Sequence, residues 1–128
     1  MRIVKHDELE VFQRAFAVAM RIFRESQGFP KAEMYSLTDQ IRRSSRSVCA
    51  NIAEAWRKRR YEAHFISKLS DVEAEAAETQ VWLDFALHCG YLASDVHTEI
   101  KDVYDGILRT LVGMITHPDS WIIKPADK

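Results

Sequence analysis

The chain has 128 residues, of which 47% are hydrophobic and 29% are charged, and its formal net charge is −1 at pH 7. These values predict one ordered domain and exclude an intrinsically disordered chain. A net charge so close to zero also argues against a protein that binds nucleic acid without selectivity.

The sequence predicts neither a membrane span nor a signal peptide. No apolar run approaches the roughly 18 residues that a membrane span needs. The N-terminal segment contains Asp7, Glu8 and Glu10, where a signal peptide would be apolar. Cys49 and Cys89 have no CxxC spacing and are expected to be reduced thiols. We therefore expect a cytoplasmic protein with no membrane partner.

Residues 7–26 are predicted to form the first helix, because apolar residues recur there at steps of three and four. Gly28 and Pro30 mark its end. Two apolar stripes run side by side along this helix. We expect the first stripe to face the core: Leu9, Phe12, Phe16, Ala19 and Phe23. The second stripe contains Ala15 and three candidate subunit-interface residues: Val11, Val18 and Ile22.

Three more helices are predicted over residues 31–58, 61–88 and 95–116. The second helix has a core face made of Leu37, Ile41, Ser45, Val48, Ile52 and Ala55. The third alternates steps of four and three, as in coiled coils, along Phe65, Leu69, Val72, Ala76, Thr79, Leu83 and Ala86. The fourth has a core face made of Val96, Ile100, Val103, Ile107, Leu111 and Met114.

The boundaries of these helices follow from a few residues. Gly90 is expected to cap the third helix, Ser94 to be the N-cap of the fourth, and Pro118 to end it. Residues 119–128 are expected to form a loosely held tail. Four helices joined by short loops predict an all-α fold, a single up-down-up-down antiparallel four-helix bundle.

One series of residues resembles the signature of a known family: Phe29-Pro30, Glu33, Tyr35, Leu37, Gln40 to Arg43, Ser47 and Asn51-Ile52-Ala53-Glu54. A second block is similar as well: Glu78 to Gln80, Trp82-Leu83 and Gly90 to Leu92. This is the four-helix-bundle family named for reading frames in the intervening sequences of bacterial 23S rRNA genes. Ala55 stands where that family commonly has glycine, so the second helix is expected to continue to Lys58.

The resemblance implies a closed homopentameric ring of bundles. It extends distantly to the accessory variability determinant of diversity-generating retroelements, a basic barrel that binds reverse transcriptase and nucleic acid. It does not by itself imply a biochemical task.

No pattern of residues indicates catalysis. Bundles that hold two metal ions need Glu-x-x-His pairs, and the chain has none. It also lacks a nucleophile elbow and a phosphate-binding glycine loop. Ser44, Ser45 and Ser47 lie mid-helix, where hydroxyls usually mark close packing or hydrogen bonds back to the previous turn. We therefore expect no enzyme, no cofactor, no metal site and no small-molecule substrate.

The charges are divided unevenly along the chain. Residues 1–60 carry 13 Lys and Arg against 7 Asp and Glu, whereas residues 61–128 carry 5 against 12. Seven cations on or directly after the second helix are candidates for a nucleic-acid surface or an interface: Arg42, Arg43, Arg46, Arg57, Lys58, Arg59 and Arg60. The last four also suit a helix C-terminus, whose dipole favours cations.

Two further features of this surface suggest a contact between subunits. Cys49, Ala50 and Ala53 fall beside the arginines and would leave a shallow groove. The third helix carries a complementary ridge: Asp71, Glu75, Glu78 and Trp82. A basic groove facing the acidic ridge of a neighbour would make a head-to-tail contact, which can close into a ring.

Two functions remain open from the sequence. The first is a non-catalytic homo-oligomeric scaffold or adaptor. The second is a nucleic-acid-binding accessory protein that uses the basic surface of the second helix to contact RNA or DNA. A pI near 6.5 argues against the second function, because dedicated binders tend to be strongly basic.

Overall fold

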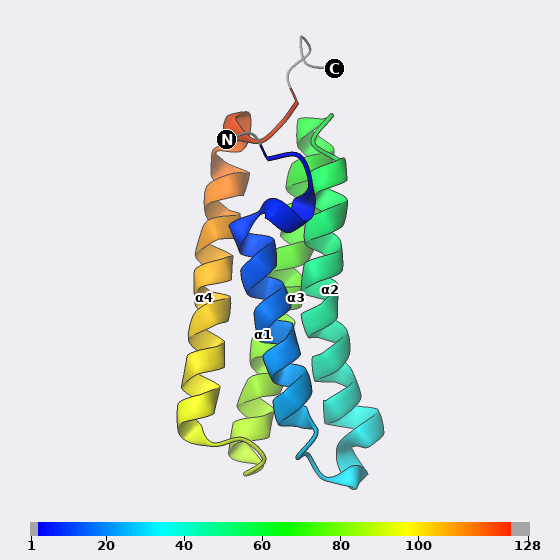
Figure 1. Ribbon diagram of the computed structural model, residues 1–128, viewed down its shortest axis with the longest axis vertical. Helices are drawn as coiled ribbons and strands as arrows, with labels where there is room; N and C mark the ends of the chain where they lie inside the picture. Colours follow the sequence, from blue (N-terminus) through cyan, green and yellow to red (C-terminus); the bar gives the residue numbers. More distant parts are fainter. Residues whose placement is uncertain (1–2, 124–128) are drawn as a thin grey trace.

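The structure is a computed structural model that describes residues 3–123. Four long helices pack antiparallel in an up-down-up-down bundle (Figure 1): α1 Glu10–Ser26, α2 Asp39–Arg57, α3 Glu62–His88 and α4 Ser94–Thr116. Helices adjacent in the sequence lie side by side, and α1 packs on α4 to close the bundle. The described residues contain no strand. The predicted all-α four-helix bundle is therefore confirmed.

Short helical turns precede α1 and α2. The 3-10 turn η1 His6–Glu8 is separated from α1 by the extended backbone of Leu9, so α1 begins at Glu10. A 3-10 turn, η2 Lys31–Glu33, and a π-helical segment, η3 Met34–Thr38, lead into α2. A fourth turn, η4 Pro118–Ser120, follows α4.

The observed helix ends agree with some of the local sequence signals and differ from others. Gly90 adopts φ 80°, and the amide of Tyr91 donates to the carbonyl of Ala86 at 2.9 Å, which closes α3 as its glycine predicts. Ser94 is the first residue of α4 rather than its cap, and the extended Ala93 precedes it. α2 ends at Arg57, with Lys58 as its C-cap.

The core corrects the assignment of the two α1 stripes. Val11, Val18 and Ile22 are buried within this chain, so they cannot form a subunit interface. Phe16 remains 53% exposed and Met20 41% exposed.

Apolar residues cover more than one face of α1, so the helical period alone could not choose between the faces. The compact side chains of both stripes, Leu9 and Ala19 included, fill the close-packed interior. Phe12 and Phe23 of the first stripe are only half-buried.

The second and third helices bury the faces that periodicity selected, and α4 does so in part. All predicted core residues of the second and third helices are buried. In α4, Val96 and Val103 of the predicted face are only half-buried, and Tyr104, which the periodicity argument left out, is buried instead. Small residues bring α2 and α3 together, and the Thr79 hydroxyl donates to the Ser44 hydroxyl at 2.8 Å. Ser44 and Ser45 are buried, and their hydroxyls also donate to carbonyls of the previous turn, at 3.4 and 3.1 Å.

The segment after α4 is not loose as far as the structure describes it. Trp121 packs edge-on against Trp56, with 6.5 Å between ring centroids. The amide of Ile123 donates to the carbonyl of Arg59 at 2.9 Å. The Trp56 indole donates to the carbonyl of Val4 at 3.1 Å, so the segments before α1 and after α4 are both attached at the same end of the bundle (Figure 1). Residues 124–128 of the predicted tail lie outside the described residues.

Candidate interaction surfaces

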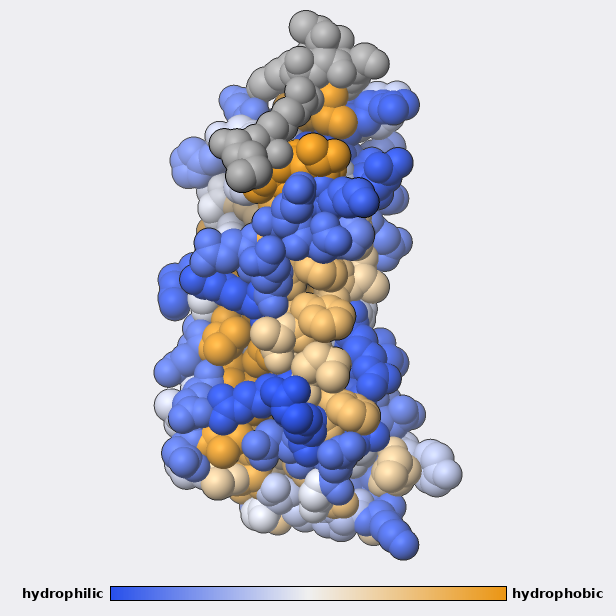
Figure 2. Space-filling model, in the orientation of Figure 1, coloured by the Kyte–Doolittle hydropathy of each residue, from blue (hydrophilic) through white to orange (hydrophobic). Residues whose placement is uncertain are grey.

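A groove of about 440 Å³ runs between α1 and α2. Its lining is almost wholly apolar and consists of His6, Phe12, Phe16, Ala19, Met20, Arg46, Cys49, Ala50 and Ala53. Figure 2 shows an apolar band on this face, flanked by hydrophilic side chains. We call this feature the α1/α2 groove.

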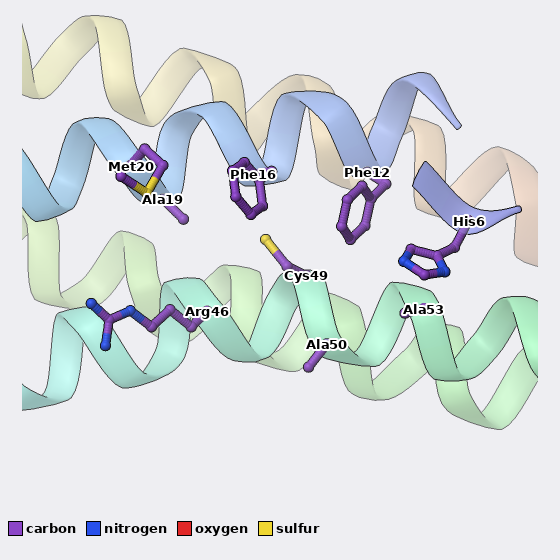
Figure 3. A pocket seen from close by; sticks show the side chains of 9 residues that line it. All are labelled: His6, Phe12, Phe16, Ala19, Met20, Arg46, Cys49, Ala50 and Ala53. Carbon is purple, nitrogen blue, oxygen red and sulfur yellow. The ribbon is translucent and has the colours of Figure 1, made fainter. Parts of the chain in front are cut away.

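The groove exists because the two helices contribute side chains of different size. α1 supplies the large Phe12, Phe16 and Met20, whereas α2 supplies small residues such as Ala50. In Figure 3 the side chains of Phe16 and Cys49 point toward each other across it. The small α2 residues therefore leave the shallow groove that their positions predicted, and the exposed stripe of α1 forms its other wall.

Aromatic contacts close one end of the α1/α2 groove. The ring of Phe12 stacks on Phe16 at 6.1 Å and meets the His6 ring edge-on at 4.9 Å. Arg46 lies at the other end, beside Met20 (Figure 3). Its guanidinium is 5.8 Å from the centroid of the Phe23 ring. The groove is thus an apolar trough with a cation at one end.

The thiol in the groove is not poised for chemistry. Burial raises the pKa of the Cys49 thiol to about 11, so the reactive thiolate is scarce near neutral pH. Cys89 at the end of α3 is exposed. Cys49 therefore serves as a small apolar wall of the groove.

α3 carries a second exposed apolar surface, which consists of Val81, Trp82 and Phe85 and which we call the α3 patch. Val81 is 47% exposed and Phe85 is 54% exposed. Trp82 is half-buried, with its ring centroid 6.0 Å from that of Phe85, and its indole reaches the Glu78 carboxylate at 3.4 Å. Shallow hollows lie on both sides of Phe85, one of them lined by Asp84 and the other by Leu37.

The seven candidate cations do not form one surface. Arg42 donates to the Ser26 hydroxyl at 2.8 Å, and its guanidinium lies 4.9 Å from the Phe23 centroid. Arg43 is bound to Glu78, and Arg59 stacks 3.4 Å above the Trp56 ring. These three arginines have structural partners within the chain.

The remaining candidates divide between two places. Arg46 lines the α1/α2 groove, as described above. Arg57, Lys58 and Arg60 are exposed around the C-terminal end of α2, and they form no ion pair with any residue in the range 3–123. Among the seven candidates, exposed cations without an ion pair in the described part of the chain gather only at this end of the bundle.

The predicted acidic ridge on α3 is partly neutralised inside the chain. Glu78 pairs with Arg43 at 2.7 Å, and Asp71 lies 3.8 Å from the Lys68 ammonium. One carboxylate oxygen of Glu75 is buried without a hydrogen-bond partner among the described residues. Because α2 and α3 are neighbours in the same bundle, part of the predicted contact between chains occurs within one chain.

A charged cluster that sequence reasoning missed ties α3 to α4. The Asp84 carboxylate lies 2.8 Å from the His97 ring nitrogen and 2.9 Å from the Lys101 ammonium. The hydrogen bond from Lys101, followed by that from His97, lowers the pKa of Asp84. The signal was available only as isolated charges on two helices, because their pairing depends on the register between the helices.

The family motif residues have structural roles. Ile52 is in the core, and Ala53 lines the α1/α2 groove. The Asn51 amide donates to the Ser47 carbonyl at 2.9 Å, and Glu54 lies 3.5 Å from Lys68. Gln40 lines the hollow beside Phe85. The motif therefore shapes the α2 surface and its contacts.

Within residues 3–123, no group of three or more His, Cys, Asp or Glu side chains is placed to hold a metal ion. None of the helices in that range combines the length and the apolar character that crossing a bilayer requires.

The fold and these surfaces define a small all-α bundle protein whose signature residues support packing. The chain belongs to the 23S rRNA-intervening sequence protein family, whose model matches residues 7–113. It is similar to a solved protein of unknown function from the S23 ribosomal protein family of Bacteroides thetaiotaomicron. That similarity has 28% identity and a TM-score of 0.74, and it covers 82% of this chain and 97% of the other. No curated protein matches the chain.

Proposed function

We propose that this protein is a non-catalytic scaffold or adaptor that works as a homo-oligomeric ring. The observation that carries the proposal is the α1/α2 groove, an open apolar trough whose walls include the exposed Phe16 and Met20. Contiguous apolar patches on a soluble protein mark surfaces that another molecule covers. A second copy of the chain is the one partner that is always present at the same concentration.

The energetic argument rests on the exposed α1 stripe. Full burial of a Phe or Met side chain contributes about 1.5–3 kcal/mol. Because Phe16 and Met20 are exposed, the isolated chain does not gain much of that contribution. Association that covers both side chains, together with Phe12 and the alanines opposite, therefore favours an assembled state over the isolated bundle.

A ring of five chains is the assembly that the family resemblance implies. Size-exclusion chromatography with multi-angle light scattering, at about 100 mM and about 500 mM salt, tests the proposal. We expect a mass of about five times the 14.8 kDa chain at both salt concentrations, because burial of apolar surface does not weaken with salt. A monomer at both salt concentrations would overturn the proposal.

A second function, nucleic-acid binding, is favoured by one observation. Arg57, Lys58 and Arg60 are exposed together and form no ion pair within residues 3–123. Fluorescence anisotropy with labelled single-stranded RNA and DNA, at about 50 and 200 mM salt, tests it. Binding through phosphate contacts should weaken steeply between these salt concentrations. A variant with alanine at all three positions should bind more weakly. If it gives the same anisotropy as the parent chain, these residues do not form a nucleic-acid surface.

A further inference from the structure

We infer that the occupant of the α1/α2 groove is the α3 patch of a second copy of this chain. This inference rests on the self-association proposed above and specifies which surfaces meet. It follows from the shapes of the two surfaces, from their charges and from their positions on the bundle.

The two surfaces are complementary in shape, and the patch is short enough to enter the groove. The groove is concave, and its α1 wall extends from Phe12 to Met20, eight residues and about 12 Å at the helical rise. The α3 patch is convex, because Val81 and Phe85 project from one helix. From Val81 to Phe85 the patch rises about 6 Å, so it fits within the length of the groove.

The α2 wall of the groove is made of small side chains, which leaves space opposite α1. Cys49, Ala50 and Ala53 form its α2 wall, and these residues leave room for a large side chain between themselves and Phe16. An aromatic ring such as Phe85 of a second copy would fill that room, and aromatic contacts with Phe12 and Phe16 favour such a ring. Two grooves facing each other would leave the trough unfilled.

The charges of the two surfaces are complementary. The lining of the groove contains no Asp or Glu, and it includes Arg46, which has no ion pair within residues 3–123. The α3 patch is bordered by carboxylates, with Glu78 beside Trp82 and Asp84 in the hollow beside Phe85. A carboxylate accepts several hydrogen bonds, so Asp84 can accept one from Arg46 of a second copy while it retains Lys101.

The positions of the surfaces determine the kind of assembly. α2 and α4 each pack on both α1 and α3, so α1 and α3 lie diagonally across the bundle. A chain therefore cannot place its own α3 patch in its own groove. Because the two surfaces differ, the contact is head-to-tail, and each added copy leaves one groove and one patch open until a ring closes.

Complementation between two variants tests the inference. Ala50→Arg fills the groove and leaves the patch intact, whereas Phe85→Glu charges the patch and leaves the groove intact. Both positions are exposed, so both variants should fold, which circular dichroism checks. Each variant alone should give the 14.8 kDa monomer in light scattering. An equimolar mixture should give a 1:1 heterodimer of about 30 kDa, twice the chain mass, through the one contact that remains intact.

Two results would overturn the inference alone, and a third would overturn the proposed function. Full assembly by Phe85→Glu alone would mean that the patch is not the occupant, while the proposed scaffold would survive. Two monomeric variants that fail to combine would also contradict a head-to-tail contact. A monomeric parent chain would defeat the proposed function itself. Val81→Glu and Val112→Glu form a matched pair, since both valines are about equally exposed at 47% and 49% and only the first lies in the patch. Only Val81→Glu should reduce the assembled mass.

Discussion

Arg43 on α2 and Glu78 on α3 form an ion pair within a single chain, with 2.7 Å between Nη2 of the arginine and Oε2 of the glutamate. The same carboxylate oxygen is 3.4 Å from the Trp82 indole nitrogen. This pair joins the basic half of the sequence to the acidic half inside the bundle. It removes one cation and one acid from the set of residues available for contacts between chains.

The Arg43–Glu78 pair should contribute little to stability. Their side chains are 53% and 36% exposed, and exposed ion pairs typically contribute about 0.2–1 kcal/mol. A double-mutant cycle with Arg43→Ala and Glu78→Gln, measured by urea unfolding, should give a coupling energy within about that range. A coupling of several kcal/mol would show that the pair is a major link between α2 and α3.

The α2–α3 contact should instead depend on its small buried residues. Ser44 is fully buried and accepts a hydrogen bond from Thr79 at 2.8 Å. Ser44→Leu would force side-chain volume into a close-packed contact, and overpacking of this kind costs about 1–3 kcal/mol. Urea unfolding of Ser44→Leu beside Ser70→Leu, at an exposed α3 position, measures the effect. Equal midpoints for the two variants would contradict the packing described.

Asp84 should make stability dependent on acid pH. Hydrogen bonds from Lys101 and then His97 lower the pKa of Asp84 from its ordinary value of 3.8. The stabilisation is therefore fully present above the ordinary pKa and is lost as the pH falls from there through the lowered folded pKa. Asp84→Asn removes this contribution.

The measurement is the melting temperature of the parent chain and of Asp84→Asn between about pH 7 and pH 3, at one protein concentration. The parent should melt higher near neutral pH, and the difference should shrink as the pH falls below the ordinary value of 3.8. A difference that stays constant down to the lowest pH would mean that ionised Asp84 has no special stabilisation in the folded state.

The two thiols should react at very different rates. Burial raises the pKa of the Cys49 thiol to about 11, whereas Cys89 is exposed. Iodoacetamide at about pH 8 should therefore label Cys89 first, and Cys49 should react only after unfolding. Peptide mass spectrometry over time distinguishes the sites. Equally fast labelling of both cysteines in the folded protein would contradict the closed wall of the α1/α2 groove.

The sequence predicted the fold well where one periodic stripe dominated. The α2 and α3 core faces and the glycine end of α3 needed only helical spacing and local backbone preference. α1 was different, because Val18 and Phe16 belong to stripes of similar apolar character. Which of them faces the core depends on how closely the neighbouring helices approach, and that distance is a tertiary property.

The interaction surfaces were only partly accessible from the sequence. The small residues Ala50 and Ala53 indicated a shallow groove on α2. The opposite wall could not be predicted once Phe16 had been assigned to the core. In the same way, the attachment of Trp121 to Trp56 joins residues far apart in the chain. Such contacts arise from packing at the bundle end rather than from any local pattern.

The most direct test of the account is the sedimentation velocity of the parent chain, Phe16→Glu and Val112→Glu. Both substitutions place a carboxylate at an exposed apolar position, 53% exposed at Phe16 and 49% at Val112, but only Phe16 lines the α1/α2 groove. We expect the parent and Val112→Glu to sediment as the same oligomer and Phe16→Glu to sediment as a monomer. A parent chain that sediments as a monomer, or a Phe16→Glu variant that remains fully assembled, would contradict the claim that this groove joins the chains.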